Sequence, residues 1–284
     1  MDVLRKSKGD TMNKLKVSLL VFFLVFSIGL FGCRAQADDE YAKVTLNGST
    51  SMEKLMNALR EGVQQDYPEL QLEPQFTGSS SGIEAVINQT TDIGNSSRPL
   101  KEEEKEKGIV ENIVAIDAIA VITDTQNPIN NLTKQQLMDI YLGKIRNWKD
   151  IGGKDQPIVV IGREAGSGTR NAFEELLGIE GQCQYANEYN ETGPVFAKVS
   201  SIPGAIGYVS LDVIDNQVQL LSIDGVLPQK QTIQNGKYLL QRPFVMATLG
   251  NIDEQRKEVQ IVFDYIKSEK GKKIIESVGL IVPQ

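Results

Sequence analysis

The sequence predicts an α/β protein built from two lobes. Short apolar strands alternate with segments of helical periodicity from Lys43 onward, which is the pattern of βα units. A second set of such elements lies between Thr123 and Lys237. No long Pro- or Ser-rich linker separates the two sets, so we expect the chain to cross between the lobes more than once. Lobes joined in this way favour a ligand cleft with hinges.

The first set of elements lies in residues 43–122. Its βα-like repeats favour an open, mostly parallel sheet, and Leu70–Phe76 alternates with the period of two that is typical of a strand. The apolar run Ile113–Ile122 is broken only by Asp117 and predicts a buried strand. Strands are expected at 43–46, 70–76, 92–94 and 113–122, and helices at 52–63 and 83–87. The charged stretch 101–107 is interpreted as a solvated helix face without a further role.

The second set supplies the second lobe, and the chain then returns to the first. We expect lobe I to comprise 43–122 and 240–284, and lobe II to comprise 123–239, with the ligand cleft between them. The expected helices are 133–141, 169–177, 254–268 and 271–278, and the expected strands are 158–161, 206–209 and 243–247.

The composition excludes several classes of function. The 284 residues contain no histidine and two cysteines, so a Ser-His-Asp triad, a zinc helix of the H-E-x-x-H type and a Cys/His zinc knuckle are all ruled out. The formal net charge of −7 argues against a nucleic acid partner held by counterion release. We therefore expect no catalytic activity, no cofactor, no metal and no nucleic acid.

The N-terminus has the layout of a signal peptide. Lys14 and Lys16 precede the apolar run 17–31, which is shorter than the ~20 residues of a permanent membrane-spanning helix. The run ends in Gly32-Cys33, and this arrangement resembles the lipobox of bacterial lipoproteins. It predicts a lipoprotein signal peptide at 1–32 and a lipid, such as palmitate, on Cys33. An ordinary signal peptide with an incidental cysteine is the alternative, and Met12 is an alternative start.

Removal of the predicted leader leaves an acidic protein on a short tether. It removes five cationic and two anionic side chains, so that 25 cationic and 35 anionic side chains remain and the net charge is near −10. Residues 33–42 would then tether the domain to the outside of the cell membrane through the lipid. Cys183 has no cysteine partner left, so the fold must be held by its core, and we expect a buried thiol instead of a reactive one.

Four short loops rich in hydroxyls and glycine follow predicted strands. A helix N-terminus offers unpaired N–H donors and a partial positive charge, and both favour an anion. Each loop alone is equally consistent with helix capping. Together they are expected to converge beyond the carboxyl ends of the strands and to hold a small oxyanion with hydroxyls, amides and one guanidinium. The loops are Gly48–Ser51, Gly78–Gly82, Asn95–Arg98 and Arg163–Arg170.

Asp117 is a carboxylate inside an apolar strand and therefore needs a partner. One interpretation pairs it with an arginine such as Arg98. The other places it in the anion cleft, where an ionised carboxylate accepts hydrogen bonds but cannot donate them. It would then select phosphate, which carries a proton near neutral pH, over sulfate, which does not.

The loops resemble those of a known family, the substrate-binding lipoproteins of bacterial Pst-type phosphate ABC importers. The resemblance runs from about Val44 to Val282. It implies a two-lobed periplasmic-binding-protein fold of type II, in which each lobe is a central mixed β-sheet flanked by helices. It also implies a monomer that closes on one inorganic phosphate and delivers it to the permease subunits. The matching stretches are Gly48–Ser51, Gly78–Gly82, Ile140–Trp148, Arg163 with Gly166–Arg170, and Pro203–Val209.

The resemblance also implies which residues bind phosphate. By motif these are Thr50, Ser51, Ser79, Ser97, Arg163, Ser167, Gly168 and Thr169. Many family members have an aspartate acceptor where Ser97 stands, and our hypothesis is that Asp117 has taken over this role. They also have an aspartate beside the arginine where Ala165 stands, and we expect Glu164 to restrain Arg163 instead.

Two other functions are alternatives. The first is a binding protein for another tetrahedral oxyanion, such as sulfate or molybdate. The second is a serine-dependent phosphatase or hydrolase with Ser167 as nucleophile. Gly166-Ser167-Gly168 lacks the G-x-S-x-G spacing of a nucleophile elbow, and the chain has no histidine to activate the serine.

Overall fold

The structure is a computed structural model that describes residues 42–283. The predicted signal peptide and Cys33 lie outside the described residues. Within the described part, every helix is too short or too polar to cross a membrane.

Three parallel strands form the first part of the sheet. β1 (Ala42–Gly48) pairs with β2 (Leu70–Phe76) on one side and with β3 (Ile93–Ser96) on the other. β1 leads into α2 (Glu53–Asp66) and β2 leads into α3 (Ser79–Ile87). The βα units expected in the first lobe are therefore confirmed, and the carboxyl ends of β1, β2 and β3 lie at one edge of the sheet.

A second parallel group repeats this arrangement. β7 (Val159–Arg163) lies between β8 (Asn187–Tyr189) and β9 (Ala205–Ser210). α6 (Gly168–Leu177) follows β7, and α7 (Thr192–Ser201) follows β8. The helix and strands expected here are confirmed, whereas β8 and α7 were not predicted.

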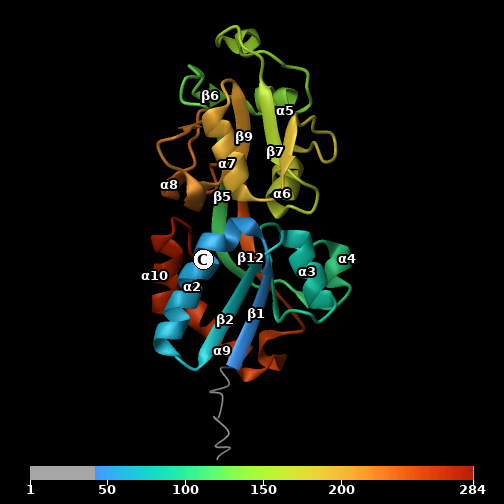
Figure 1. Cartoon of the computed structure of the whole chain (residues 1–284), viewed down its shortest axis with the longest axis vertical. Coiled ribbons are helices and arrows are strands. Elements are labelled where there is room, and N and C mark those ends of the chain that lie inside the picture. The colour runs from blue at the N-terminus through green and yellow to red at the C-terminus, as the bar shows by residue number, and fades with distance from the viewer. Residues whose placement is uncertain (1–41, 284) are drawn as a thin grey trace, which may run out of the picture. The chain divides into compact units, whose positions relative to one another are not determined.

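Two long antiparallel strands, β5 (Ile113–Thr123) and β12 (Gln241–Leu249), connect the two groups (Figure 1). β12 also pairs with β3, and β5 pairs with β9, so the strand order is β2-β1-β3-β12-β5-β9-β7-β8. The sheet is therefore mixed and not mostly parallel. β5 belongs to one hydrophobic core up to Ala115 and to two others from Ala118 onward. We call β5 and β12 the crossover strands.

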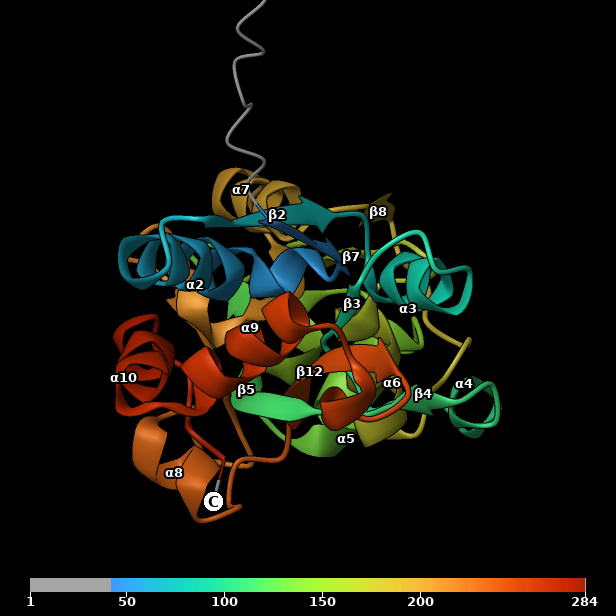
Figure 2. The same ribbon diagram turned by 90° about the horizontal axis from the view of Figure 1, so that it is seen from below.

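Each lobe has its own hydrophobic core. In the first lobe, α2, α9 (Lys257–Lys267) and α10 (Glu269–Ser277) cover one face of the sheet, and α3 packs on the other face (Figure 2). In the second lobe, Trp148 is fully buried and donates from Nε1 to the Gly204 carbonyl at 3.0 Å. The structure is thus the two-lobed α/β fold that the sequence predicted.

Short elements complete the chain, and one of them corrects a prediction. The charged stretch 101–107 contains α4 (Glu102–Lys105), and Glu104 is not solvated: it accepts two hydrogen bonds from the buried Arg98 guanidinium, at 2.6 and 2.9 Å. The remaining elements are β4 (Ile109–Val110), β6 (Asn131–Leu132), α5 (Lys134–Tyr141), β10 (Gln219–Leu220), β11 (Ser222–Ile223), α8 (Lys230–Gln234) and the 3-10 helices η1 (Thr50–Met52), η2 (Trp148–Ile151), η3 (Leu211–Val213) and η4 (Ile252–Glu254).

Candidate anion-binding site

The three hydroxyl-rich loops of the first lobe come together. They follow β1, β2 and β3, which are neighbouring parallel strands, so their ends meet at one sheet edge. The Ser49 hydroxyl donates to the Ser97 hydroxyl at 2.8 Å, and the Ser79 and Ser97 hydroxyl oxygens lie 3.4 Å apart. The predicted convergence of these loops is therefore confirmed.

The fourth loop reaches the same place from the second lobe. The Ser51 and Thr169 hydroxyl oxygens lie 2.7 Å apart. Gly168 passes so close to the first lobe that a Cβ added there would lie 2.2 Å from the Ser79 Oγ and 2.7 Å from the Ser97 Oγ. A side chain at position 168 would therefore force Ser79 or Ser97 to shift, because the two lobes approach each other at this point.

The cluster is rich in hydrogen-bond donors and closed to solvent. α3 and α6 begin at Ser79 and Gly168, so two helix N-termini add free N–H groups and partial positive charge. Ser167 also caps α6, because its hydroxyl accepts a hydrogen bond from the Arg170 N–H at 3.4 Å. The predicted residues of the four loops are all buried: Thr50, Ser51, Ser79, Ser97, Arg163, Ser167, Gly168 and Thr169.

Arg163 is the cation of the cluster. It is 2% exposed and ends β7, and its Nη2 donates across the lobe boundary to the Thr50 hydroxyl at 2.9 Å. It also donates from Nη2 to the Asn190 carbonyl at 2.7 Å, from Nε to the Tyr189 carbonyl at 3.1 Å, and from Nη1 to the Thr192 hydroxyl at 3.2 Å. All four acceptors are neutral oxygens.

No carboxylate within residues 42–283 forms an ion pair with Arg163. Burial, together with the nearby charge of Arg242, lowers the pKa of Arg163 to about 10, which still leaves it charged at neutral pH. The expectation that Glu164 restrains the guanidinium is wrong, because the Glu164 side chain is exposed and makes no hydrogen bond to it. A buried cation without a counter-ion is costly, so the site is prepared for an anion.

A network behind the site fixes the backbone of Arg163. Its N–H donates to the Tyr208 hydroxyl at 3.3 Å, and its carbonyl accepts from Arg170 Nη1 at 2.9 Å. Glu174 in turn binds Arg170 Nε at 2.8 Å and the Tyr185 hydroxyl at 2.9 Å. Because these groups are mostly buried and mutually bonded, the strand end that carries Arg163 is held rigidly.

Asp117 pairs with an arginine, but not with Arg98. Arg242 lies opposite Asp117 on the crossover strands and donates to Oδ2 from Nε at 3.0 Å and from Nη2 at 2.9 Å. Ser210 donates to Oδ1 at 2.9 Å. The remaining Arg242 nitrogen, Nη1, donates to the Ser97 carbonyl at 3.1 Å.

This geometry corrects the hypothesis that Asp117 faces the ligand as its proton acceptor. Both carboxylate oxygens are occupied, and the residue is 1% exposed. Burial raises the pKa of Asp117, while the Arg242 charge and the Ser210 hydroxyl act in the opposite direction. Two guanidinium donors on one oxygen at these distances define an ion pair, so we treat both groups as charged. Asp117 therefore contacts the site only indirectly, through Arg242 and Ser97.

Asp212 is a second buried carboxyl group beside this ion pair. It lies on η3, just after β9, and is 8% exposed. Neither of its carboxylate oxygens has a hydrogen-bond partner, although its carbonyl accepts from Lys54 Nζ of α2 at 2.8 Å. Burial, and then the charge of Asp117, raise the pKa of Asp212 to about 7.

Arg242 and Thr192 are among the members of this arrangement that were not predicted from the sequence. Arg242 directly precedes a predicted strand, but its pairing with Asp117 depends on a register between distant strands. Thr192 precedes Gly193-Pro194, and a threonine followed by proline within the first turn is a recognisable helix start. That signal was available in the sequence for Thr192.

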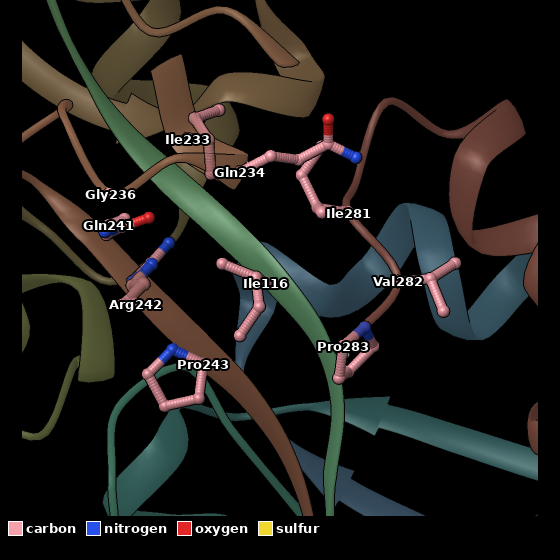
Figure 3. A pocket seen from close by; sticks show the side chains of 10 residues that line it. All are labelled: Ile116, Ile233, Gln234, Gly236, Gln241, Arg242, Pro243, Ile281, Val282 and Pro283. Carbon is pink, nitrogen blue, oxygen red and sulfur yellow. The ribbon is translucent and has the colours of Figure 1, made fainter. Parts of the chain in front are cut away.

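A separate pocket of about 370 Å³ lies beside the crossover strands (Figure 3). It contains no serine or threonine and shares only Arg242 with the groups described above. It therefore lacks the hydroxyl donors of the loop cluster. Its lining residues are Ile116, Ile233, Gln234, Gly236, Gln241, Arg242, Pro243, Ile281, Val282 and Pro283. No group of three or more Cys, Asp or Glu side chains within the described residues is arranged to hold a metal ion.

The fold and site define a substrate-binding protein of the periplasmic type, and comparison with known proteins agrees. The model of the PBP superfamily domain matches residues 34–283. The phosphate-binding protein PstS of Bacillus subtilis is 32% identical over 288 residues, which cover 95% of this chain and 94% of that protein. PstS of Borreliella burgdorferi is 30% identical over an alignment that covers 94% of this chain and 98% of that protein. The chain belongs to the PstS family of phosphate-binding proteins.

Solved structures support the same assignment. A phosphate ABC transporter substrate-binding protein from Clostridium perfringens, solved with bound phosphate, is 36% identical and superposes with a TM-score of 0.82. It is matched over its whole length and over 85% of this chain. An ABC-type phosphate transport receptor from Vibrio cholerae is 33% identical and superposes with a TM-score of 0.72. The match covers 100% of that protein and 84% of this chain.

Proposed function

We propose that this protein binds inorganic phosphate between its two lobes and delivers it to the permease of an ABC importer. The observation that carries the proposal is Arg163, a buried guanidinium that is surrounded by hydroxyl groups and has no carboxylate partner. An anion is the ligand whose charge would balance this guanidinium. The relatives named above, which bind phosphate by name, support phosphate as that anion.

The proposed ligand set spans both lobes. Lobe I would comprise 43–122 with 240–284, and lobe II would comprise 123–239. From lobe I, Thr50, Ser51, Ser79 and Ser97 would donate hydroxyl or backbone N–H groups, and from lobe II, Arg163, Ser167, Gly168 and Thr169 would supply the guanidinium, hydroxyls and amides. Hydrogen bonds to a charged acceptor are about twice as strong as neutral ones, so replacing the contacts between hydroxyls by contacts to phosphate favours binding.

Hydroxyls are the groups of this site that could accept the proton of a bound phosphate. Because Asp117 is occupied by Arg242 and Ser210, no free carboxylate of the ion pair is left to accept the ligand's proton. Serine and threonine hydroxyls can accept as well as donate, so Ser97 or Ser79 can serve a protonated phosphate oxygen. Sulfate and molybdate remain the alternative ligands, because the same donors serve any tetrahedral oxyanion.

Calorimetric titration with phosphate and sulfate at pH 6 and pH 8 tests the assignment. We expect phosphate to bind and sulfate to bind at least tenfold more weakly at both pH values. Arg163→Ala is expected to reduce phosphate affinity at least 100-fold, because two or more charge-assisted hydrogen bonds are lost. Arg60→Ala, on α2 and outside the site, is the matched control. Sulfate binding as tight as phosphate binding, or an unaffected Arg163→Ala variant, would refute the proposal.

We also propose that the protein is a monomer held outside the cell membrane by a lipid on Cys33. The Gly32-Cys33 sequence after an apolar run supports the anchor. In cells that express the full chain, Cys33→Ala is expected to move the protein from the membrane fraction to the medium or periplasm. Retention of the variant in the membrane would contradict the anchor, and light scattering would report the oligomeric state.

We propose binding without catalysis. Ser167 would be the nucleophile of a phosphatase, but its hydroxyl accepts the Arg170 N–H as a helix cap, and the sequence has no histidine. Incubation with p-nitrophenyl phosphate is expected to release no nitrophenol above the level of a Ser167→Ala control. Release of nitrophenol that depends on Ser167 would favour the alternative function, a serine-dependent phosphatase.

A further inference from the structure

Thr192 belongs to the hydroxyl cluster although it lies outside the four predicted loops. It is the first residue of α7, in the second lobe, and is 5% exposed. Its hydroxyl oxygen lies 3.2 Å from Arg163 Nη1, 3.3 Å from the Thr50 Oγ1 and 3.3 Å from the Ser51 Oγ. One side chain therefore contacts the guanidinium and two of the three hydroxyls of the first loop.

The hydroxyl of Thr192 has a proton without a short acceptor. Arg163 Nη1 donates to its oxygen, so the Thr192 proton is left to point at Thr50 or Ser51. Both oxygens are 3.3 Å away, which is long for a hydrogen bond between hydroxyls. Thr50 already accepts from Arg163 Nη2 at 2.9 Å, and Ser51 is paired with Thr169 at 2.7 Å. An anionic oxygen among these groups would be the better acceptor for the Thr192 proton.

The N-terminus of α7 lies beside the cluster, because Thr192 is its first residue. α7 has ten residues, and the side chain of Glu191, which precedes it, makes no capping hydrogen bond. The N–H groups of Thr192 and Gly193 lie in its first turn, and a Cβ added at Gly193 would meet no atom within 4 Å. The free N–H groups and the helix dipole add to the positive potential around Arg163.

The same segment also holds the guanidinium in position. The carbonyls of Tyr189 and Asn190 accept from Arg163 Nε and Nη2, and β8 pairs with β7 so that Tyr189 lies opposite Arg163. Residues 189–192 therefore fix the direction of Arg163 with neutral oxygens and leave its charge uncompensated. The hydroxyl of Thr192 is the one group of this segment that both touches Arg163 and has a proton to donate.

We propose that Thr192 is a further anion contact that donates its hydroxyl proton to the bound oxyanion while it positions Arg163. The proposal rests on the proposed function of the site. It assigns α7 to the binding machinery, so that the anion is held by segments following β1, β2, β3, β7 and β8. It also distinguishes Thr192 from a residue that only packs, because the contribution resides in the hydroxyl and not in the methyl group.

Calorimetric titration of the full chain with inorganic phosphate tests this assignment. Thr192→Val keeps the shape of the side chain and replaces the hydroxyl with a second methyl group. We expect phosphate to bind about 10- to 100-fold more weakly, as for one lost hydrogen bond to a charged group. Thr192→Ser restores a hydroxyl and is expected to bind within about threefold of the wild type. Ser200→Ala, which removes an exposed hydroxyl from the other end of α7, is the control and is expected to bind like the wild type.

Thermal unfolding without phosphate separates binding from folding. We expect the unliganded midpoint of Thr192→Val to stay close to that of the wild type, while the increase produced by phosphate becomes smaller. If Thr192→Val lowers the unliganded midpoint strongly, Thr192→Ala and Thr192→Ser decide the matter, because only a donor role predicts recovery of affinity in the serine variant alone. Equal losses in the valine and serine variants would overturn the proposal, as would a valine variant that binds like the wild type.

Failure of this proposal and failure of the proposed function give different results. If the wild type does not bind phosphate, or if Arg163→Ala binds as well as the wild type, the site itself has been assigned wrongly. If the wild type binds and Arg163→Ala does not, but Thr192→Val is unaffected, the site stands and only the role of Thr192 is refuted.

Discussion

Asp212→Asn is expected to stabilise the folded protein at alkaline pH and to leave it almost unchanged at acidic pH. The Asp212 carboxyl is 8% exposed, its oxygens have no hydrogen-bond partner, and it faces the charges of Asp117, Arg242 and Lys54. Burial and the Asp117 charge raise its pKa from 3.8 to about 7 in the folded protein. Between these two values the folded state holds a proton that the unfolded state has released.

The sign of the effect follows from this difference. Stability falls as the pH rises from about 4 to about 7, and the cost is complete above pH 7 because the carboxylate is then ionised in both states. The full shift corresponds to at most about 4 kcal/mol. Relaxation and water around η3 reduce this, so we expect about 2 kcal/mol, or about 4–8 °C in the midpoint of a protein of this size.

Thermal unfolding followed by circular dichroism at pH 4.5 and pH 8 measures the effect. Asp212→Asn is expected to raise the midpoint by several degrees at pH 8 and by less than about 2 °C at pH 4.5. The matched control is Asp215→Asn, three residues further on, whose side chain is exposed. The reasoning would be refuted by a change in midpoint that is the same at both pH values, or by a larger stabilisation at pH 4.5.

Three further outcomes are expected. Asp117→Asn leaves its buried arginine partner without a counter-ion and is expected to lower the free energy of unfolding in urea by about 3–5 kcal/mol. The ratio of phosphate affinity to sulfate affinity is expected to change less than threefold. A collapse of that ratio would show that Asp117 accepts the ligand's proton directly. Gly168→Ala forces a Cβ to within 2.2 Å of the Ser79 Oγ and is expected to weaken phosphate binding more than tenfold in calorimetry. Burial raises the pKa of the Cys183 thiol to about 12. In a Cys33→Ala background, Ellman's reagent at pH 8 is therefore expected to react much more slowly with the folded protein than with the protein in urea. Equal rates would contradict a protected thiol.

The local structure could be predicted well from the sequence where apolar residues recur with one clear spacing, either that of a strand or that of a helix. Leu70–Phe76 alternates strictly and forms β2 with those limits. The helix expected at 133–141 forms α5, and Thr133 caps it, because a threonine followed three residues later by glutamine makes reciprocal hydrogen bonds at the helix start. The hydroxyl-rich loops were also identifiable, although each alone was equally consistent with helix capping, because four of them follow predicted strands in one chain.

The parts that were not predicted depend on contacts between distant segments. Asp117 and Arg242 are 125 residues apart, and only the antiparallel register of the crossover strands makes them partners. Arg98 was the nearer candidate in sequence, but α4 brings Glu104 to it instead. Similarly, Thr192 joins the site because β8 lies beside β7, and β8 is a three-residue strand without a clear pattern. Local periodicity contains no information about such pairings.

The charges of the site explain how an acidic protein can hold an anion. The chain has a formal net charge of −7, so its long-range field repels phosphate, but that field is screened beyond about 8 Å in physiological salt. Within the site, Asp117 neutralises Arg242, whereas Arg163 is bonded only to neutral oxygens. One uncompensated positive charge is therefore buried where the lobes meet. Water would solvate Arg163 if the lobes separated, and an anion would pair with it when they close. Under the proposed function, the anion would therefore interact more favourably with a closed arrangement than with an open one, and such a difference in affinity would allow the ligand to drive closure.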